Sequence, residues 1–367
     1  MDERVLEAML PYMRESFGNA GGKYSYGYEA RKAVNEARKT IAAAINAEPD
    51  EIYFTSGGTE GNNTVLRSFG TVISSETEHD SVLKTLEAAK KTGVNVRLLK
   101  PDDKGFVTQQ SLEKALKEIQ VNTGDLSKNP LVSVMLVNNE TGNIQPIKEL
   151  AETAHSRGFL FHTDAVQAAG HIRIDVKELG ADFLTVSGHK LYGPKGTGFM
   201  FVKRGRNIDP LIFGGGQERG MRSGTENVPG IVGLAKACEL AALELDANSG
   251  KESEIAGYFK TRLLKNIPDS VLNGEGKWIL NFSFAGVNGT SLALRLDMEN
   301  ICVSTGSACS SGLDERSHVL TAMGLSNQRA DSSIRISIGK YNTLDEAADS
   351  CCCIEKLVHE LRNIGNI

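Results

Sequence analysis

The sequence has few aromatic residues, few prolines and no long apolar run. Phe, Trp and Tyr make up 6% of its 367 residues, with a single Trp and nine Pro. No apolar stretch approaches the roughly 20 residues that a membrane-spanning helix needs. There is also no dense Lys/Arg tract, and the formal net charge is −5. We therefore expect neither a membrane nor a nucleic acid as a partner.

Cysteine is present without the spacings that usually give it a structural role. The six cysteines include no Cys-x-x-Cys pair, so they predict no resident metal and no disulfide framework. The run Cys351–Cys353 lies in a helix expected over residues 343–362, which opens with a Thr343/Glu346 capping box. Cys351 falls on the apolar stripe of that helix, and consecutive helical residues point in different directions. We interpret the run as helix packing, in a protein of the reducing cytoplasm.

Near-continuous apolar runs alternate with helical patterns over most of the chain. Residues 131–137 are the clearest strand, a helix is expected over 147–158, and the next strand ends at Asp164. This alternation predicts an α/β fold with a mainly parallel sheet, in which ligands gather at the carboxyl ends of the strands.

The pattern changes toward the C-terminus. A long helix expected over residues 233–247 leads into a polar stretch, 248–251. The strands that follow indicate a smaller α+β domain, and we expect them near residues 279–284, 301–304 and 334–338. We predict a large domain over residues 8–245 and a small one over 246–367, with residues 1–7 packed on the small one.

Two neighbouring apolar runs end in an acid and a lysine. Residues 159–161 lead into Asp164, and residues 183–186 lead to Lys190. A lysine in this place can form a Schiff base with pyridoxal phosphate, and the acid can keep the pyridine nitrogen protonated. Either residue alone is more often an ordinary surface lysine or strand-end acid, so the prediction depends on further features.

Three glycine-rich segments supply those features. Residues 55–60 read as a strand, a Gly-Gly turn and a helix start near Thr59, which would attract a phosphate. Residues 213–227 carry hydroxyl, guanidinium and amide groups without an apolar side, as expected of a ligand or interface loop. In residues 304–312, Cys309 lies among small polar residues, a setting typical of a reactive thiol on a loop.

These segments together resemble the pyridoxal-phosphate cysteine desulfurases of the NifS/IscS type. The matching stretches run in the same order along almost the whole chain, at residues 55–60, 76–79, 138–142, 162–167, 187–190, 222–225 and 307–309. The resemblance implies the aspartate aminotransferase-like fold type I, with a seven-stranded sheet in the large domain. It implies conversion of L-cysteine to alanine, and delivery of sulfur to an iron–sulfur scaffold or a sulfur-carrier protein.

The resemblance also implies a role for each matching site residue. Lys190 would hold the cofactor and move the Cα proton, and Cys309 would attack the substrate sulfur, become a persulfide and transiently ligate a cluster. His79 would stack on the ring and relay protons. The remaining implied contacts are Asp164 with the pyridine nitrogen, Gln167 with the ring hydroxyl, Gly58, Thr59, Ser187 and His189 with the phosphate, Thr225 with the phosphate of the other subunit of a homodimer, and Asn139 and Arg335 with the substrate carboxylate.

Three alternatives stay open at this point. A selenocysteine lyase of the same fold would use the same thiol on selenium. A class V aminotransferase needs no loop thiol, so Cys309 argues against it. A non-catalytic protein that docks a scaffold is kept open because the short opening strand and loop usual in the family do not precede Asp2.

Overall fold

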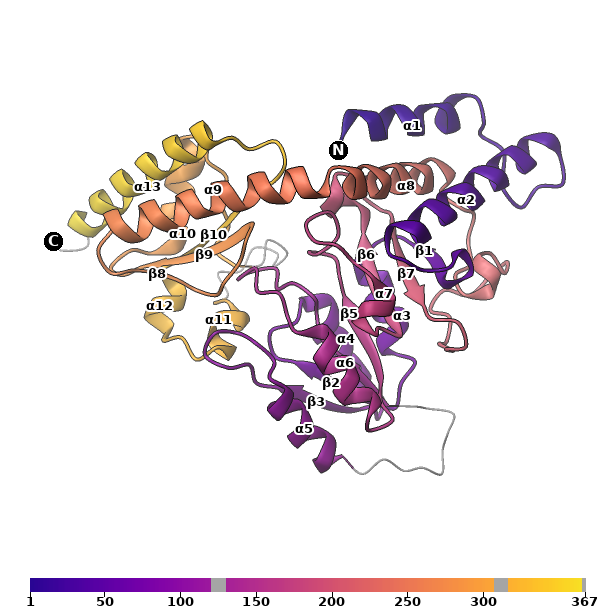
Figure 1. The fold of residues 1–367 in the computed structure, drawn as a ribbon, viewed down its shortest axis with the longest axis horizontal. Coiled ribbons are helices and arrows are strands. Elements are labelled where there is room, and N and C mark those ends of the chain that lie inside the picture. Colours follow the sequence, from indigo (N-terminus) through magenta and orange to yellow (C-terminus); the bar gives the residue numbers. More distant parts are fainter. Residues whose placement is uncertain (120–129, 307–315, 365–367) are drawn as a thin grey trace. The chain divides into compact units, whose positions relative to one another are not determined.

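The computed structural model describes residues 1–119, 130–306 and 316–364 of the chain (Figure 1). The chain divides into two compact units, which do not follow the sequence continuously. The first comprises Met1–Leu99, Gln109–Leu136 and Pro146–Leu245, and the second comprises Lys100–Thr108, Val137–Gln145 and Asp246–Ile367. Two short segments of the N-terminal half therefore belong to the second unit.

The first unit is built on a seven-stranded sheet with the order β1-β7-β6-β5-β4-β2-β3. Its strands are β1 (Ile52–Thr55), β2 (Thr71–Ser75), β3 (Asn95–Leu99), β4 (Leu131–Ser133), β5 (Leu160–Asp164), β6 (Phe183–Ser187) and β7 (Gly198–Val202). The pairs from β3 through β2, β4 and β5 to β6 are parallel, while β7 is antiparallel to both β6 and β1. The expected α/β fold with a mainly parallel sheet is confirmed.

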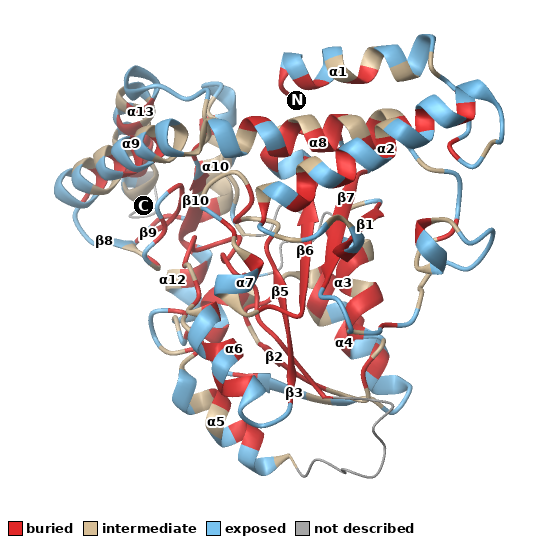
Figure 2. Ribbon diagram, turned by 45° about the vertical axis from the view of Figure 1, so that its right-hand side comes forward, coloured by how far each residue is buried: buried red, intermediate tan, exposed pale blue. Residues whose placement is uncertain are grey.

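The central strands are buried along their whole length because helices cover the sheet. Every residue of β5, β6 and β7 is buried (Figure 2). Such strands read in the sequence as continuous apolar runs. Phe183 on β6 also packs edge-to-face against Phe69, with ring centroids 5.6 Å apart. The strand expected over 131–137 is shorter than predicted, although Val134 and Leu136 still donate backbone hydrogen bonds to β5.

The helices of the first unit are α1 (Glu3–Arg14), α2 (Ser25–Ala44), α3 (Gly58–Leu66), α4 (Asp80–Lys91), α5 (Gln109–Glu118), α6 (Ile147–His155), α7 (Val176–Leu179) and α8 (Val228–Leu243). Helix α1 packs on α8, the Asp2 N–H donates to the Tyr192 carbonyl at 2.9 Å, and Arg4 forms an ion pair with Glu244. Residues 1–7 thus belong to the first unit and not to the small one, where we expected them. The partners of Asp2 and Arg4 lie almost 200 or more residues further along the chain, so no local sequence pattern indicates these contacts.

The second unit contains a three-stranded antiparallel sheet with the order β10-β9-β8. Its elements are β8 (Ser270–Leu272), β9 (Ile279–Phe284), β10 (Ser333–Ser337), α9 (Leu245–Asn266), α10 (Gly289–Met298), α11 (His318–Ala322), α12 (Asn327–Asp331) and α13 (Leu344–Ile364). Along β9, the buried apolar residues Leu280, Phe282 and Phe284 alternate with polar Asn281 and Ser283. One face of this sheet is therefore apolar and the other polar.

Some expected elements of this C-terminal part differ from those observed. Residues 248–251 continue α9 instead of forming a polar linker, and α8 begins at Val228, before the expected residue 233. Residues 301–304 do not form the expected strand. Of these residues, Ser304 alone pairs with β10, in an isolated bridge to Arg335.

The C-terminal helix has the start that its sequence predicts. The Glu346 carboxylate accepts the Thr343 N–H at 3.0 Å, and the Thr343 hydroxyl accepts the Glu346 N–H at 3.2 Å. Cys351 lies in the core, and its burial raises the pKa of the thiol to about 12. The interpretation of Cys351 as a packing residue agrees with this position.

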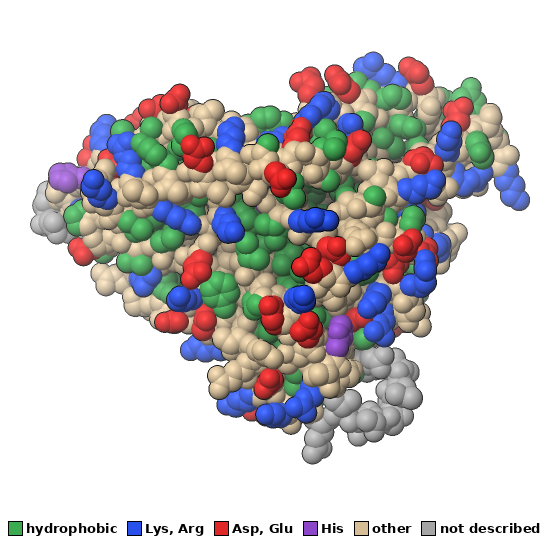
Figure 3. Space-filling model, in the orientation of Figure 1, with side chains coloured by type: hydrophobic (Ala, Val, Ile, Leu, Met, Phe, Trp, Pro, Cys, Tyr) green, Lys and Arg blue, Asp and Glu red, His purple; other side chains and the backbone are tan. Residues whose placement is uncertain are grey.

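The surface carries charges of both signs. On the face in Figure 3, the Lys/Arg and Asp/Glu side chains are interspersed. Among the described residues, no helix is long and apolar enough to cross a membrane.

Candidate functional site

The carboxyl ends of β5 and β6 carry the two residues on which the cofactor prediction rests. Asp164 is the last residue of β5, and Ser187 is the last residue of the adjacent parallel strand β6. A short 3₁₀ helix, Gly188–Leu191, follows β6 directly and contains Lys190, whose side chain is exposed. The acid and the lysine therefore leave neighbouring strands at the same edge of the sheet, where ligands of such sheets bind.

Asp164 is a buried carboxylate whose surroundings suit a cationic partner. It is 5% exposed; its Oδ1 accepts the Val166 N–H at 2.9 Å and its Oδ2 accepts Asn62 Nδ2 at 2.6 Å. Burial raises the pKa of this carboxyl group, while the two donors and the charges of His79 and Lys190 oppose the rise. A protonated ring nitrogen beside Asp164 would stabilise the ionised form further.

Asn62 is a functional residue that the sequence analysis missed. It is fully buried in α3 and donates through Nδ2 to both Asp164 and Ser81 Oγ, the latter at 2.9 Å. One signal was available, because Asn62 is four residues after Gly58 and so lies on the same face of the helix.

The start of α3 has the geometry of a helix N-terminus that a phosphate could approach. The first N–H groups of a helix have no partner within it, and together with the helix dipole they attract anions. A Cβ on Gly58 would lie 2.7 Å from Val166 Cγ2, and a Cβ on Gly61 would lie 2.6 Å from Thr185 Cγ2. Only glycine therefore lets the helix approach the strand ends this closely, and Thr59 is exposed at this N-terminus.

Further groups expected at the phosphate are the side chains of Ser187 and His189. Ser187 Oγ and His189 Nδ1 are 2.9 Å apart. Burial and the nearby charges of Lys190 and Lys195 lower the pKa of His189, which favours the neutral ring. Gln167, three residues after Asp164, is half-buried.

His79 is held by the start of α4. Its Nδ1 accepts the Ser81 N–H at 3.0 Å and lies 2.9 Å from Ser81 Oγ. Because a backbone N–H can only donate, Nδ1 carries no proton, and a neutral His79 must carry its proton on Nε2. Ser81 and Asn62 thus connect His79 to Asp164 through hydrogen bonds.

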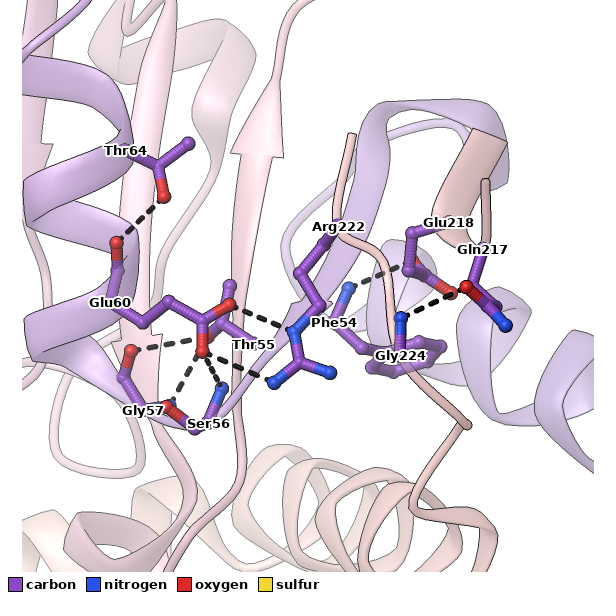
Figure 4. Close-up of polar contacts among 10 residues, drawn as sticks. All are labelled: Phe54, Thr55, Ser56, Gly57, Glu60, Thr64, Gln217, Glu218, Arg222 and Gly224. Atoms are coloured by element: carbon purple, nitrogen blue, oxygen red, sulfur yellow. Dashed lines mark hydrogen bonds and ion pairs between the residues drawn. The ribbon is translucent and has the colours of Figure 1, made fainter. Parts of the chain in front are cut away.

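The glycine-rich segment 213–227 forms an ion pair with α3 and a hydrogen bond with β1 (Figure 4). Arg222 Nε lies 3.1 Å from Glu60 Oε1, and the other oxygen of Glu60 accepts the Ser56 N–H at 2.9 Å. Glu218 pairs with Arg38 at 2.7 Å and accepts the Phe54 N–H at 2.9 Å. Thr225 is exposed beyond these anchors.

In the second unit, the two residues expected at the substrate carboxylate are in contact. Arg335 on β10 donates from Nη1 to the Asn139 carbonyl at 2.9 Å and from Nη2 to Ser304 Oγ at 3.3 Å. Asn139 is 5% exposed. Cys309 lies outside the described residues.

The whole chain is similar to several known proteins. The family model described as aminotransferase class-V matches residues 1–349. A cysteine desulfurase IscS from Dictyoglomus turgidum is 43% identical, over 99% of this chain and 93% of its own. A NifS-like protein from Rickettsia africae is 31% identical and superposes with a TM-score of 0.88, over 98% of this chain and 96% of its own. SspA in complex with cysteine is 33% identical with a TM-score of 0.78, over 94% and 97% of the two chains.

Proposed function

The chain belongs to the aminotransferase class-V family and is a pyridoxal-phosphate-dependent cysteine desulfurase; from this premise we propose how its residues carry the reaction. The enzyme converts L-cysteine to L-alanine and passes the sulfur to Cys309 as a persulfide. The observation that carries the proposal is the buried Asp164 carboxylate beside Lys190, at neighbouring strand ends next to the start of α3.

The residues of the first unit fit pyridoxal phosphate. Bound there, the cofactor supplies an electron sink for the substrate carbon. Asp164 would hold the ring nitrogen, Gln167 the ring hydroxyl, and His79 one face of the ring. The phosphate would be bound by Gly58, Thr59, Ser187 and His189. Lys190 would hold the aldehyde carbon.

The chain's own groups then bind the substrate and move its protons. Arg335 and Asn139 hold the substrate carboxylate, and a guanidinium can do so through two parallel hydrogen bonds. Lys190 takes the proton from the substrate Cα. His79, protonated on Nε2 when neutral, exchanges a proton with the substrate thiol.

The sulfur step is a displacement at sulfur. The Cys309 thiolate attacks the substrate sulfur, an S–S bond forms, and the carbon–sulfur bond breaks. The released electron pair stays on the former Cβ, which takes up a proton to become the methyl group of alanine. No external oxidant or reductant is needed, because the oxidation of sulfur balances the reduction of carbon.

The sulfur then goes to an acceptor protein. We propose an iron–sulfur scaffold or a sulfur-carrier protein as this partner, with Cys309 as a transient cluster ligand during transfer. We also propose a cytoplasmic location, where reducing conditions keep an acceptor thiol reduced between turnovers.

The reaction is tested with purified holoenzyme. Incubation with L-cysteine and a thiol reductant should produce alanine and sulfide in equal amounts. Selenocysteine, supplied in a parallel reaction, distinguishes the alternative. Alanine formed from selenocysteine but not from cysteine would assign the chain as a selenocysteine lyase instead.

We further propose a homodimer in which Thr225 binds the phosphate of the partner subunit. The proposal is supported by the segment 213–227, which Arg222 joins to Glu60 and in which Thr225 is exposed. Reassociating equal amounts of Lys190→Ala and Thr225→Ala chains should return about a quarter of the wild-type sites, because a heterodimer has one site with both defects and one with neither.

Mixing Lys190→Ala with the double variant Lys190→Ala/Thr225→Ala is the control, since every site then lacks the lysine. Activity that does not return although mass spectrometry shows heterodimers would contradict the shared site. A fully active monomer in sedimentation would contradict the dimer.

A further inference from the structure

A buried asparagine on α3 joins two groups of the proposed cofactor site. Asn62 is fully buried, and its Nδ2 donates to Asp164 Oδ2 at 2.6 Å and to Ser81 Oγ at 2.9 Å. The helix that carries it lies close against β6, because a Cβ on Gly61 would lie only 2.6 Å from Thr185 Cγ2. The backbone of α3 therefore holds the amide at a fixed place beside the ends of β5 and β6.

The contacts of Asn62 determine which way its amide faces. An ionised carboxylate only accepts hydrogen bonds, so the amide nitrogen and not the oxygen faces Asp164. Among the residues that the structure describes, none donates a hydrogen bond to the buried Oδ1 of Asn62. A buried oxygen without a donor costs free energy and calls for an explanation. This cost is accounted for if the residue acts through its two N–H groups.

The hydrogen bonds that start at Asn62 end on two acceptors. Ser81 Oγ accepts from Asn62, so its own proton can be donated to His79 Nδ1, 2.9 Å away. His79 Nδ1 carries no proton, because it accepts the Ser81 N–H at 3.0 Å. One end of this network is thus the proton-free nitrogen of His79, and the other end is the carboxylate of Asp164.

Asn62 supplies one of the two hydrogen-bond donors that the structure describes at Asp164. The other donor is the Val166 N–H, 2.9 Å from Oδ1. Burial raises the pKa of Asp164, and both donors oppose the rise. Without Asn62, a single donor would remain on a carboxylate that is only 5% exposed, and its protonated form would be favoured. A protonated Asp164 would no longer pair with a proton on the ring nitrogen of the cofactor.

We propose that Asn62 is a positioning residue for the cofactor, which keeps Asp164 an acceptor for the ring-nitrogen proton, and that Ser81 fixes its amide for this purpose. The inference rests on the proposed pairing of Asp164 with the ring nitrogen. Because Ser81 also contacts His79, the groups proposed for the ring nitrogen and for the face of the ring share one network. Loss of Asn62 weakens cofactor binding directly, and loss of the Ser81 hydroxyl weakens it through Asn62.

The first test measures the cofactor affinity of Asn62→Leu, which keeps the side-chain volume and removes both donors. The full-length protein is freed of cofactor and titrated with pyridoxal phosphate, whose absorbance reports binding. The dissociation constant should rise about 10- to 100-fold, as expected for a lost hydrogen bond to a charged group. Thr64→Val is the matched control, because Thr64 is buried on the same helix and its hydroxyl donates to the Glu60 carbonyl at 2.8 Å. It should bind pyridoxal phosphate as the wild-type protein does.

A second ligand separates the lost donor from a general effect on packing. The probe is a carbocyclic analogue of pyridoxal phosphate, in which carbon replaces the ring nitrogen. It has no nitrogen proton for Asp164 to accept. Asn62→Leu should therefore bind this analogue as tightly as the wild-type protein does.

The pH dependence of the loss provides a further readout. The groups whose charges act on the Asp164 carboxylate are His79, Lys190 and Glu78, and Asn62→Leu alters none of them. Removing a donor raises the pKa of Asp164, so the carboxylate takes up its proton at a higher pH as the pH falls. The dissociation constant for pyridoxal phosphate of the variant, divided by that of the wild type, should therefore grow from about pH 9 to about pH 6.

A double-mutant cycle shows whether Ser81 acts through Asn62. Ser81→Ala alone should raise the dissociation constant about 3- to 10-fold, as for a lost hydrogen bond between neutral groups. In the Asn62→Leu background the same substitution should have no further effect. Thr85→Val is the control on α4, because the buried Thr85 hydroxyl donates to the Ser81 backbone carbonyl at 2.7 Å and leaves the Ser81 hydroxyl in place.

Three results would overturn the inference. The first is wild-type affinity for pyridoxal phosphate in Asn62→Leu, or in Ser81→Ala if Asn62→Leu does not fold. The second is an equal loss of affinity for the carbocyclic analogue or at every pH, which would assign the effect to packing. The third is a Ser81→Ala substitution that weakens binding equally in both backgrounds, which would mean that Ser81 acts through His79 alone. If the wild-type protein binds no pyridoxal phosphate, it is the proposed function that fails.

Discussion

Replacing Lys190 with alanine is expected to lower alanine formation to below about 0.1% of the wild-type rate. In the proposed mechanism the lysine both holds the cofactor and takes the Cα proton, and loss of a positioned general base alone costs about 10²- to 10⁴-fold. Chromatography of the alanine formed in a fixed time measures the effect. The absorbance of the cofactor–lysine linkage should disappear as well.

Lys203→Ala is the matched control for this variant. Lys203 is also exposed and directly follows β7, but it does not belong to the proposed site. Its loss should leave cysteine turnover near the wild-type rate. A borohydride-reduced cofactor found on any lysine other than Lys190 in the native protein would show that the assignment is wrong.

Replacing Cys309 with serine is expected to stop sulfide release while leaving cofactor binding intact. A serine oxygen cannot accept sulfur as a persulfide, so turnover should fall at least about 10³-fold, as for loss of a catalytic nucleophile. Mass spectrometry after incubation with cysteine should show a mass gain of one sulfur on Cys309 in the wild-type protein and none in the variant. The cofactor spectrum should be the same in both.

Cys352→Ser provides the control for a general thiol effect. Cys352 is exposed on α13, where its sulfur accepts a hydrogen bond from Arg262 Nη2 at 2.9 Å. We expect this variant to turn over cysteine normally. Persulfide on one of Cys351–Cys353, with Cys309 unmodified, would contradict the proposed mechanism.

The sequence alone was sufficient for the features that depend on local patterns. The strand that ends at Asp164 and the strand that precedes Lys190 were correctly expected to be neighbours. They could be recognised because buried parallel strands appear as continuous apolar runs. The Gly-Gly turn before α3 and the Thr343/Glu346 capping box were likewise visible as short motifs. Each of these signals depends on residues close together in the chain.

Tertiary packing decided the features that join distant segments. It placed residues 1–7 on α8, and it put Lys100–Thr108 and Val137–Gln145 in the second unit. It also brought Asn62 to Asp164 across 102 positions, and Ser317 to Glu140 across 177. Such contacts leave no periodic pattern, because each partner only needs to be a polar residue at a position where the fold brings two distant segments of the chain together. The sequence therefore determined the fold class and the chemistry of this protein, while its tertiary structure determined which side chains hold the reacting groups in place.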